Sequence, residues 1–236
     1  MSEKCTAIVL AAGQGKRMNS NIQKQFLEVK GYPVLYYSLK CFQESSLIQD
    51  IILVTGKDVV SYCKEEIVEK YGFSKVSAVI EGGKERYDSV YAGLLACENS
   101  DYVFIHDGAR PFITEEILER GLNGVKKTGA CVIGMPSKDT VKIADESGCI
   151  KETPDRKLVW NIQTPQVFET SLILQAYERL KNRLPKLQEQ GIQVTDDASV
   201  VEMFTESRVK LVEASYQNIK ITTPEDMKTA EAFLED

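Results

Sequence analysis

Apolar and polar residues follow two different patterns along the chain, and the pattern changes at Pro136. Before it, short β-branched runs alternate with longer stretches of helical periodicity. Nearly continuous apolar runs are typical of strands that are buried on both faces of a parallel sheet. A strand every 25 residues or more, roughly, is the spacing of β-α-β units. The predicted strands are 6–10, 50–55, 75–82, 102–106 and 130–135, and the predicted helices are about 34–44, 58–71, 85–98 and 114–127.

Residues 137–160 differ from the β-α-β pattern, because polar and apolar residues alternate there around a central Glu-Ser-Gly. That pattern predicts a hairpin, either at the edge of the same sheet or as an arm that packs on a second subunit. A helix to about 183 and a strand at 210–214 follow, and Thr223-Pro224 is typical of a capped helix start. We therefore predict one α/β domain over 1–236, with a Rossmann-like, mostly parallel twisted sheet flanked by helices and a protruding β-hairpin arm.

Charge and composition narrow the class of partner. The 236 residues carry a net charge of -6, which argues against non-specific nucleic-acid binding but leaves room for one phosphate-bearing small molecule. Six cysteines without a Cys-x-x-Cys pair, beside a single histidine, indicate reduced thiols rather than a zinc cluster. No apolar run approaches the roughly 20 residues of a membrane span. We expect a cytoplasmic protein that binds neither membrane nor nucleic acid.

The stretch LAAGQGKRM, residues 10–18, combines a bare backbone with strong positive charge. It matches neither a P-loop nor a dinucleotide fingerprint, since Met18 stands where the latter needs its third glycine. A run of exposed amides followed by Lys16, Arg17 and, further on, Lys24 is nonetheless suited to polyphosphate. A flexible basic turn is the alternative.

Two further junctions between strand and helix carry polar groups. In EGGKERYDSV (81–90) the glycine pair could admit a planar base, although a polar helix start of this kind is more often purely structural. In IHDGARPF (105–112) Asp107 follows a buried strand, where open α/β sheets bind ligands, and is a suitable Mg²⁺ ligand. We interpret His106 as structural or as a hydrogen-bond donor. Late in the chain, Lys220 lies on a predicted strand at 218–221 and is either solvated or a fixed cation for phosphate.

Taken together, these segments resemble one enzyme family. The strings LAAGQGKRM, KQF, GGKERYDSV, HDGARPF, KDTVK, TPQVF, TDDAS and NIKITTPED occur in the order found in 2-C-methyl-D-erythritol 4-phosphate cytidylyltransferases. The resemblance covers residues 6 to 234 and implies a nucleotidyltransferase that makes a cytidine diphosphate alcohol and pyrophosphate from CTP and a polyol phosphate, in non-mevalonate isoprenoid synthesis. Ribitol 5-phosphate cytidylyltransferases share much of this set. A nucleotide-binding domain without turnover is the alternative from another class.

The resemblance also implies roles for individual residues. The residues that it places around CTP are Ala11, Ala12, Gly13, Gly15, Gly83, Arg86, Asp88 and Ser89. The groups that it makes catalytic are Arg17, Lys24, Lys220 and Asp107, with Asp107 also holding Mg²⁺. The polyol phosphate would meet Arg110, Thr164 and Thr195, together with Thr140 and Arg156 from the arm of the second subunit of a homodimer. Lys84 departs from the family pattern, which is often acidic there.

The chemistry agrees with a chain that has one histidine. A phosphate monoester has a second pKa of about 6 and is mostly dianionic at neutral pH, so no general base is needed for its attack. The obstacle is charge repulsion between this dianion and a triphosphate. Cations and Mg²⁺ lower that barrier by positioning and by charge stabilisation. We therefore expect Arg17, Lys24 and Lys220 to do this.

Overall fold

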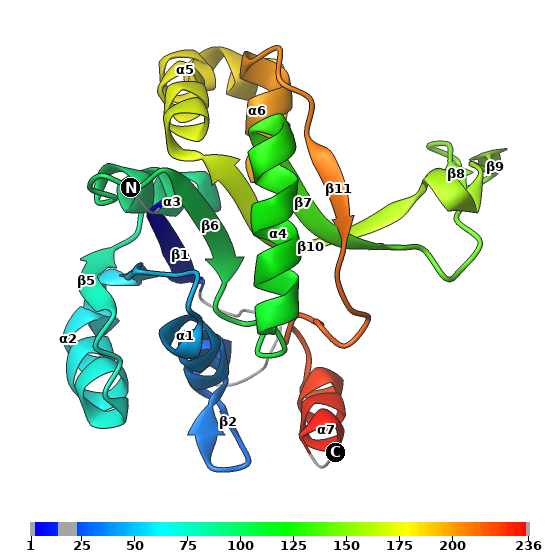
Figure 1. Ribbon diagram of the computed structural model, residues 1–236. Helices are drawn as coiled ribbons and strands as arrows, with labels where there is room; N and C mark the ends of the chain where they lie inside the picture. Colours follow the sequence, from blue (N-terminus) through cyan, green and yellow to red (C-terminus); the bar gives the residue numbers. More distant parts are fainter. Residues whose placement is uncertain (1–2, 14–22, 235–236) are drawn as a thin grey trace.

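One mixed sheet forms the centre of the part of the chain that this computed structural model describes, residues 3–13 and 23–234 (Figure 1). Its strands are β1 (Cys5–Ala11), β4 (Asp50–Thr55), β5 (Val76–Glu81), β6 (Tyr102–Asp107), β7 (Ala130–Pro136), β10 (Trp160–Glu169) and β11 (Lys210–Glu213). The order across the sheet is β11-β7-β10-β6-β1-β4-β5. All neighbours pair in parallel except β10, which runs antiparallel to β6 and β7. The predicted mostly parallel sheet is confirmed.

Helices cover both faces of this sheet. They are α1 (Val34–Glu44), α3 (Arg86–Leu95), α4 (Glu115–Thr128), α5 (Thr170–Glu189), α6 (Asp197–Phe204) and α7 (Pro224–Phe233). The predicted helix at 58–71 is a 3-10 turn, η3 (Lys57–Val59), then α2 (Val60–Tyr62) and the π-helical η4 (Cys63–Glu69). Successive β1 side chains point to opposite faces, so Val9 packs in the core with α1 and α4 while Ile8 packs with α3 and α5. This explains why the strand runs are apolar throughout.

Strand β10 is the element that the sequence pattern did not identify. It lies in the middle of the sheet although Gln163, Thr164 and Gln166 are polar. All three are buried, and hydrogen bonds satisfy them: Gln166, for example, donates to Asp196 at 2.8 Å. The register shifts between Ile162 and Gln166, where the strand passes the end of β6. Polar residues inside a central strand therefore mark the place where this sheet meets its functional site.

The predicted hairpin within 137–160 extends away from the body of the protein (Figure 1). Strands β8 (Ile143–Ala144) and β9 (Ile150–Glu152) pair with each other in a separate two-stranded sheet. The hairpin is thus an arm and not an edge of the main sheet. Several of its apolar side chains are exposed among the described residues, with Ile150 65% and Leu158 80% exposed.

Residues 218–221 form an extended loop, so the strand predicted there is wrong. The loop is held by single bonds instead of a ladder: the amide of Ile221 donates to the carbonyl of Ala109 at 2.8 Å. The predicted cap of α7 is confirmed, because the amide of Thr223 donates to the Asp226 carboxylate at 2.8 Å and Pro224 opens the helix. Among the described residues, no helix is long and apolar enough to cross a membrane.

Candidate active site

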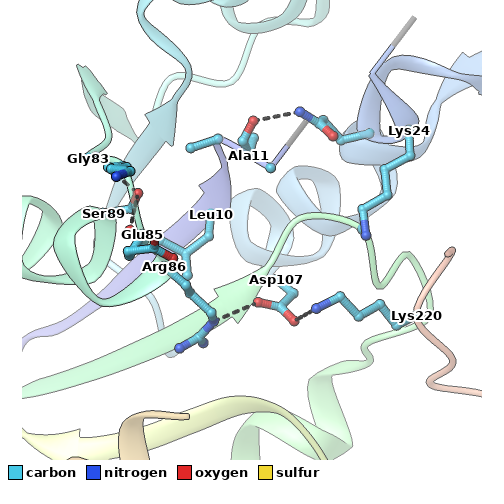
Figure 2. Close-up of a pocket in the computed structure, with 14 residues that line it drawn as sticks. Leu10, Ala11, Lys24, Gly83, Glu85, Arg86, Ser89, Asp107 and Lys220 are labelled. Atoms are coloured by element: carbon cyan, nitrogen blue, oxygen red, sulfur yellow. Dashed lines mark hydrogen bonds and ion pairs between the residues drawn. The ribbon is translucent and has the colours of Figure 1, made fainter. Parts of the chain in front are cut away.

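A pocket of about 180 Å³ lies at the carboxyl ends of β1 and β6 (Figure 2). Five segments build it: the end of β1, the 3-10 turn η2 (Lys24–Phe26), the start of α3, the end of β6 and the loop that carries Lys220. The predicted residues that line it are Ala11, Ala12, Gly13, Lys24, Gly83, Arg86, Ser89, Asp107 and Lys220. Gly15 and Arg17 lie outside the described residues. The structure therefore brings together residues that span more than 200 positions of sequence.

Asp107 is the centre of charge in this pocket. Lys220 Nζ lies 2.6 Å from one of its carboxylate oxygens, and Arg86 Nε lies 3.4 Å from the other (Figure 2). Burial on its own raises the pKa of Asp107, but Arg86 and Lys220 outweigh it and hold that pKa well below its usual range. The carboxylate is therefore ionised at neutral pH, and it keeps both cations at the pocket wall.

Arg86 also makes a two-pronged ion pair that the sequence did not reveal. Both terminal nitrogens of its guanidinium donate to the Asp197 carboxylate at 2.8 Å. Asp197 is fully buried and accepts a third hydrogen bond from the Tyr177 hydroxyl at 2.6 Å. Arg86 thus contacts both Asp107 and Asp197, and these two carboxylates hold its guanidinium in place at the pocket. Its predicted contact with the base or ribose stays a prediction.

We expect Asp197→Ala to lower the free energy of unfolding by about 2–3 kcal/mol. Removing one partner of a buried ion pair leaves the other charge uncompensated, and this value is below the usual range because Arg86 is partly exposed and keeps Asp107. Urea unfolding measures the change. The matched control is Lys181→Ala, which breaks a more exposed ion pair with Asp88 and should cost less than about 1 kcal/mol. Equal losses in the two variants would contradict the assignment.

The glycine pair at the start of α3 brings the backbone close to its own helix. A Cβ on Gly83 would lie 2.2 Å from that of Asp88, so only glycine fits. The Gly83 amide donates to the Ser89 hydroxyl at 3.1 Å, which keeps Ser89 at the pocket. Asp88 is not among the lining residues: it caps α3 through the Glu85 amide and pairs with Lys181 at 2.7 Å. The predicted role of Asp88 stays untested.

A second pocket, of about 360 Å³, adjoins the first. Arg86, Asp107 and Lys220 line both pockets. The second one adds the residues predicted for the polyol phosphate on this chain, Arg110, Thr164 and Thr195. The charged cluster at Asp107 is thus the common wall of two cavities, which is what a reaction between two substrates needs.

His106 is buried and links the two sides of this wall. Its Nε2–H donates to the Arg110 carbonyl and its Nδ1 accepts from the Thr164 hydroxyl, both at 3.1 Å. The same hydroxyl accepts from the Asp107 amide at 3.1 Å. Burial lowers the pKa of His106 to about 4, so the ring is neutral and suits this pattern. The predicted structural role of His106 agrees with these bonds.

Two predicted residues lie away from the pockets of their own chain. Thr140 and Arg156 are on the arm, where Arg156 Nη1 donates to the Lys138 carbonyl at 3.0 Å. Within one chain they cannot serve the site. Their predicted contact with substrate requires a second copy.

The donor set permits a hard cation at Asp107. The described residues contain no group of three or more His, Cys, Asp or Glu that would hold a metal by themselves. Mg²⁺, however, usually takes only one or two carboxylates and fills its shell with water and substrate phosphates. Asp107 is ionised and lines both pockets, so it fits this second mode.

Comparison with known proteins gives a consistent result. The family model described as 2-C-methyl-D-erythritol 4-phosphate cytidylyltransferase matches residues 5–236. The protein of that name from Lachnoclostridium phytofermentans is 53% identical over 234 residues, covering 99% of this chain and 97% of its own. The one from Lachnospira eligens is 52% identical over 229 residues, covering 97% and 98%.

Solved structures agree with these sequences. The 4-diphosphocytidyl-2C-methyl-D-erythritol synthase of Anaerococcus prevotii superposes with a TM-score of 0.84 at 37% identity, covering 99% of both chains. The 2-C-methyl-D-erythritol 4-phosphate cytidylyltransferase of Francisella tularensis has a TM-score of 0.79 at 28% identity, covering 98% of this chain and 99% of its own.

Proposed function

This chain belongs to the 2-C-methyl-D-erythritol 4-phosphate cytidylyltransferase family, and we propose that it joins CTP to 2-C-methyl-D-erythritol 4-phosphate in its two adjoining pockets. The chain is a nucleotidyltransferase, and the products are 4-diphosphocytidyl-2-C-methyl-D-erythritol and pyrophosphate. The observation that carries the proposal is the cluster of Arg86, Asp107 and Lys220 between the pockets. CTP occupies the pocket beside Ala11–Gly13, and the acceptor occupies the pocket beside Thr164 and Arg110.

In this arrangement the acceptor phosphate attacks the α-phosphorus of CTP in line with the leaving group. A new P–O bond forms as the bond to the β-phosphate oxygen breaks, and no proton has to move because the attacking group is a dianion. One unit-charge pair at about 4 Å and an effective dielectric of about 20 is worth roughly 4 kcal/mol. Lys220 and Lys24 can therefore offset much of the repulsion.

Asp107 is the group that we expect to hold Mg²⁺. When bound, the ion would neutralise charge on the triphosphate. Asp107 also orients the Lys220 ammonium, which it contacts at 2.6 Å. Chelation of the metal should then abolish turnover, and added Mg²⁺ should restore it.

The second element of the proposal is a homodimer formed through the arm, residues 137–160. Its exposed apolar side chains, including Ile143, Ile150 and Leu158, favour burial against another copy. In such a dimer the arm of one subunit supplies Thr140 and Arg156 to the acceptor pocket of its partner. A guanidinium suits this task because it binds phosphate with two parallel hydrogen bonds.

We expect Arg156→Ala to raise the KM for the acceptor by about 10-fold or more while the KM for CTP changes less than about 3-fold, because only the phosphate contact is lost. Steady-state kinetics with each substrate varied gives both values. Lys157→Ala, which removes the next cation of the same turn, is the control.

Mixed dimers test whether Arg156 acts across the interface. Combining Arg156→Ala subunits with Lys220→Met subunits leaves one site in the mixed dimer with both residues intact. With the acceptor well below its KM, where Arg156→Ala is slow, the mixture should be more active than either parent. A mixture no more active than the average of its parents, or a fully active monomer in sedimentation, would contradict the shared site.

The test of the function itself is an acceptor panel. Pyrophosphate release is measured with CTP and either 2-C-methyl-D-erythritol 4-phosphate or D-ribitol 5-phosphate. We expect turnover with the first. Turnover with ribitol phosphate alone would change the acceptor, and CTP binding without any turnover would indicate a nucleotide-binding domain.

A further inference from the structure

Gln25 joins two parts of the CTP pocket that belong to different elements. It lies in η2 next to Lys24, is 2% exposed, and lines the pocket. Its side-chain Nε2 donates to the backbone carbonyl of Ala11 and to Gln23 Oε1, both at 2.6 Å. The dashed line at Ala11 in Figure 2 marks the first of these bonds. A buried carboxamide thus connects the lysine turn to the last residue of β1.

Two other contacts of this turn, among the described residues, lead to helices. Phe26 packs against Tyr62 in an edge-to-face contact, with 5.2 Å between the ring centroids. The carbonyl of Leu27 accepts from the Val34 amide at 2.9 Å, which fixes the exit toward α1. These contacts hold the turn to the helices. The bond from Gln25 to Ala11 joins the turn directly to the last residue of β1.

Ala11 is the last residue of β1. The register with β6 ends one residue earlier, at Leu10 opposite Asp107, and the register with β4 ends at Ala11 itself, opposite Thr55. Beyond Ala11 the backbone leaves the sheet at Ala12 and Gly13, which line the CTP pocket. The carbonyl that Gln25 holds is therefore at the end of the strand, next to that pocket.

We propose that Gln25 is a positioning residue that fixes Lys24 relative to the CTP phosphates. This rests on the proposed function, which places Lys24 on those phosphates. The lysine side chain is a point charge on a flexible stem, so its effect in the transition state depends on where its backbone is held. A shift of the order of 1 Å in such a group can reduce the rate about 100-fold.

The test is a double-mutant cycle between Gln25→Met and Lys24→Ala. Methionine keeps the volume of glutamine and removes both hydrogen bonds. In the wild-type background we expect Gln25→Met to lower kcat/KM for CTP by about 30-fold or more, with the KM for the acceptor within about 3-fold. In the Lys24→Ala background the same change should lower it by less than about 3-fold, since Gln25 acts through Lys24.

Gln43→Met is the matched control. Gln43 also makes two side-chain hydrogen bonds, to Ser74 at 3.0 Å and from the Lys75 amide at 2.9 Å, but lies outside both pockets. It should leave kcat/KM for CTP unchanged within about 2-fold. If Gln25→Met does not fold, as judged by circular dichroism, Gln25→Asn replaces it, because a side chain one methylene shorter no longer reaches Ala11.

A binding measurement separates this inference from the proposed function. By calorimetry, Gln25→Met should weaken CTP by about 10-fold or more and leave cytidine, which has no phosphate, within about 2-fold. This readout needs no turnover, so an inactive wild-type enzyme that still binds CTP would overturn the function and leave the inference testable. Equal losses of CTP and cytidine, or the same loss of activity in both backgrounds of the cycle, would overturn the inference.

Discussion

Lys220→Met should lower kcat by about 1,000-fold and leave the fold intact. Lys220 Nζ contacts Asp107 at 2.6 Å and faces both pockets, so we place it on the α-phosphate, where negative charge is transferred. Removing one preorganised donor from a developing charge costs about 100- to 1,000-fold. The upper end applies because the neutral side chain also leaves Asp107 with one cation fewer. Single-turnover kinetics with both substrates saturating measures the change.

Two further variants serve as a control and as a test of the shape of the cation. Lys228→Met removes an exposed cation from α7, eight residues further along, and should behave as wild type. Lys220→Arg keeps the charge but changes its shape, and we expect it to recover only part of the rate, because a planar fork does not replace a compact ammonium. A kcat for Lys220→Met within about 10-fold of wild type would remove Lys220 from the chemical step.

The elements that the sequence predicted are those whose cause is local. Runs such as DIILVT form strands because β-branched residues fit a sheet that is covered on both faces, and β4 (Asp50–Thr55) has the predicted bounds. The capping box of α7 involves only Thr223 and Asp226, three residues later. The alternation of polar and apolar residues within 137–160 predicted the hairpin. Each of these signals lies within one continuous segment of the chain.

What the sequence did not predict depends on partners that are distant along the chain. Strand β10 is central although Gln163 and Thr164 are polar, because distant residues satisfy their side chains: Asn218 donates to the Gln163 side chain from 55 positions away, and the Thr164 hydroxyl bonds to His106, 58 positions away. The Arg86–Asp197 pair joins residues 111 positions apart. The sequence pattern around Arg86 does not predict that its guanidinium pairs with Asp197. The resemblance to a family predicted the residues of the site, and the structure shows the contacts among them.

The positions of Lys220 and Lys24 in the pockets suggest different tasks for the two cations. Lys220 is held by Asp107 and belongs to the wall that both pockets share. Lys24 lines only the CTP pocket and lies on the far side of it from Arg86 (Figure 2). We therefore expect Lys220 to act on the phosphorus that is attacked and Lys24 to act on the part of CTP that leaves.

Lys24→Ala should accordingly lower turnover by at least about 100-fold, because the leaving pyrophosphate loses a fixed positive charge in the transition state. Lys40→Ala, which removes an exposed cation of α1 from a 3.9 Å pair with Glu44, should have no effect. A near-wild-type rate would remove Lys24 from the mechanism.

Product inhibition distinguishes the two lysines. If Lys24 binds the leaving group, Lys24→Ala should raise the inhibition constant of pyrophosphate by about 10-fold or more, whereas Lys220→Met should change it by less than about 3-fold. The reason is that pyrophosphate keeps the β- and γ-phosphate charges but lacks the α-phosphate that we expect Lys220 to contact. The same increase in both variants would mean that the two lysines act on the same phosphates of CTP. The assignment of Lys220 to the attacked phosphorus and of Lys24 to the leaving group would then be wrong.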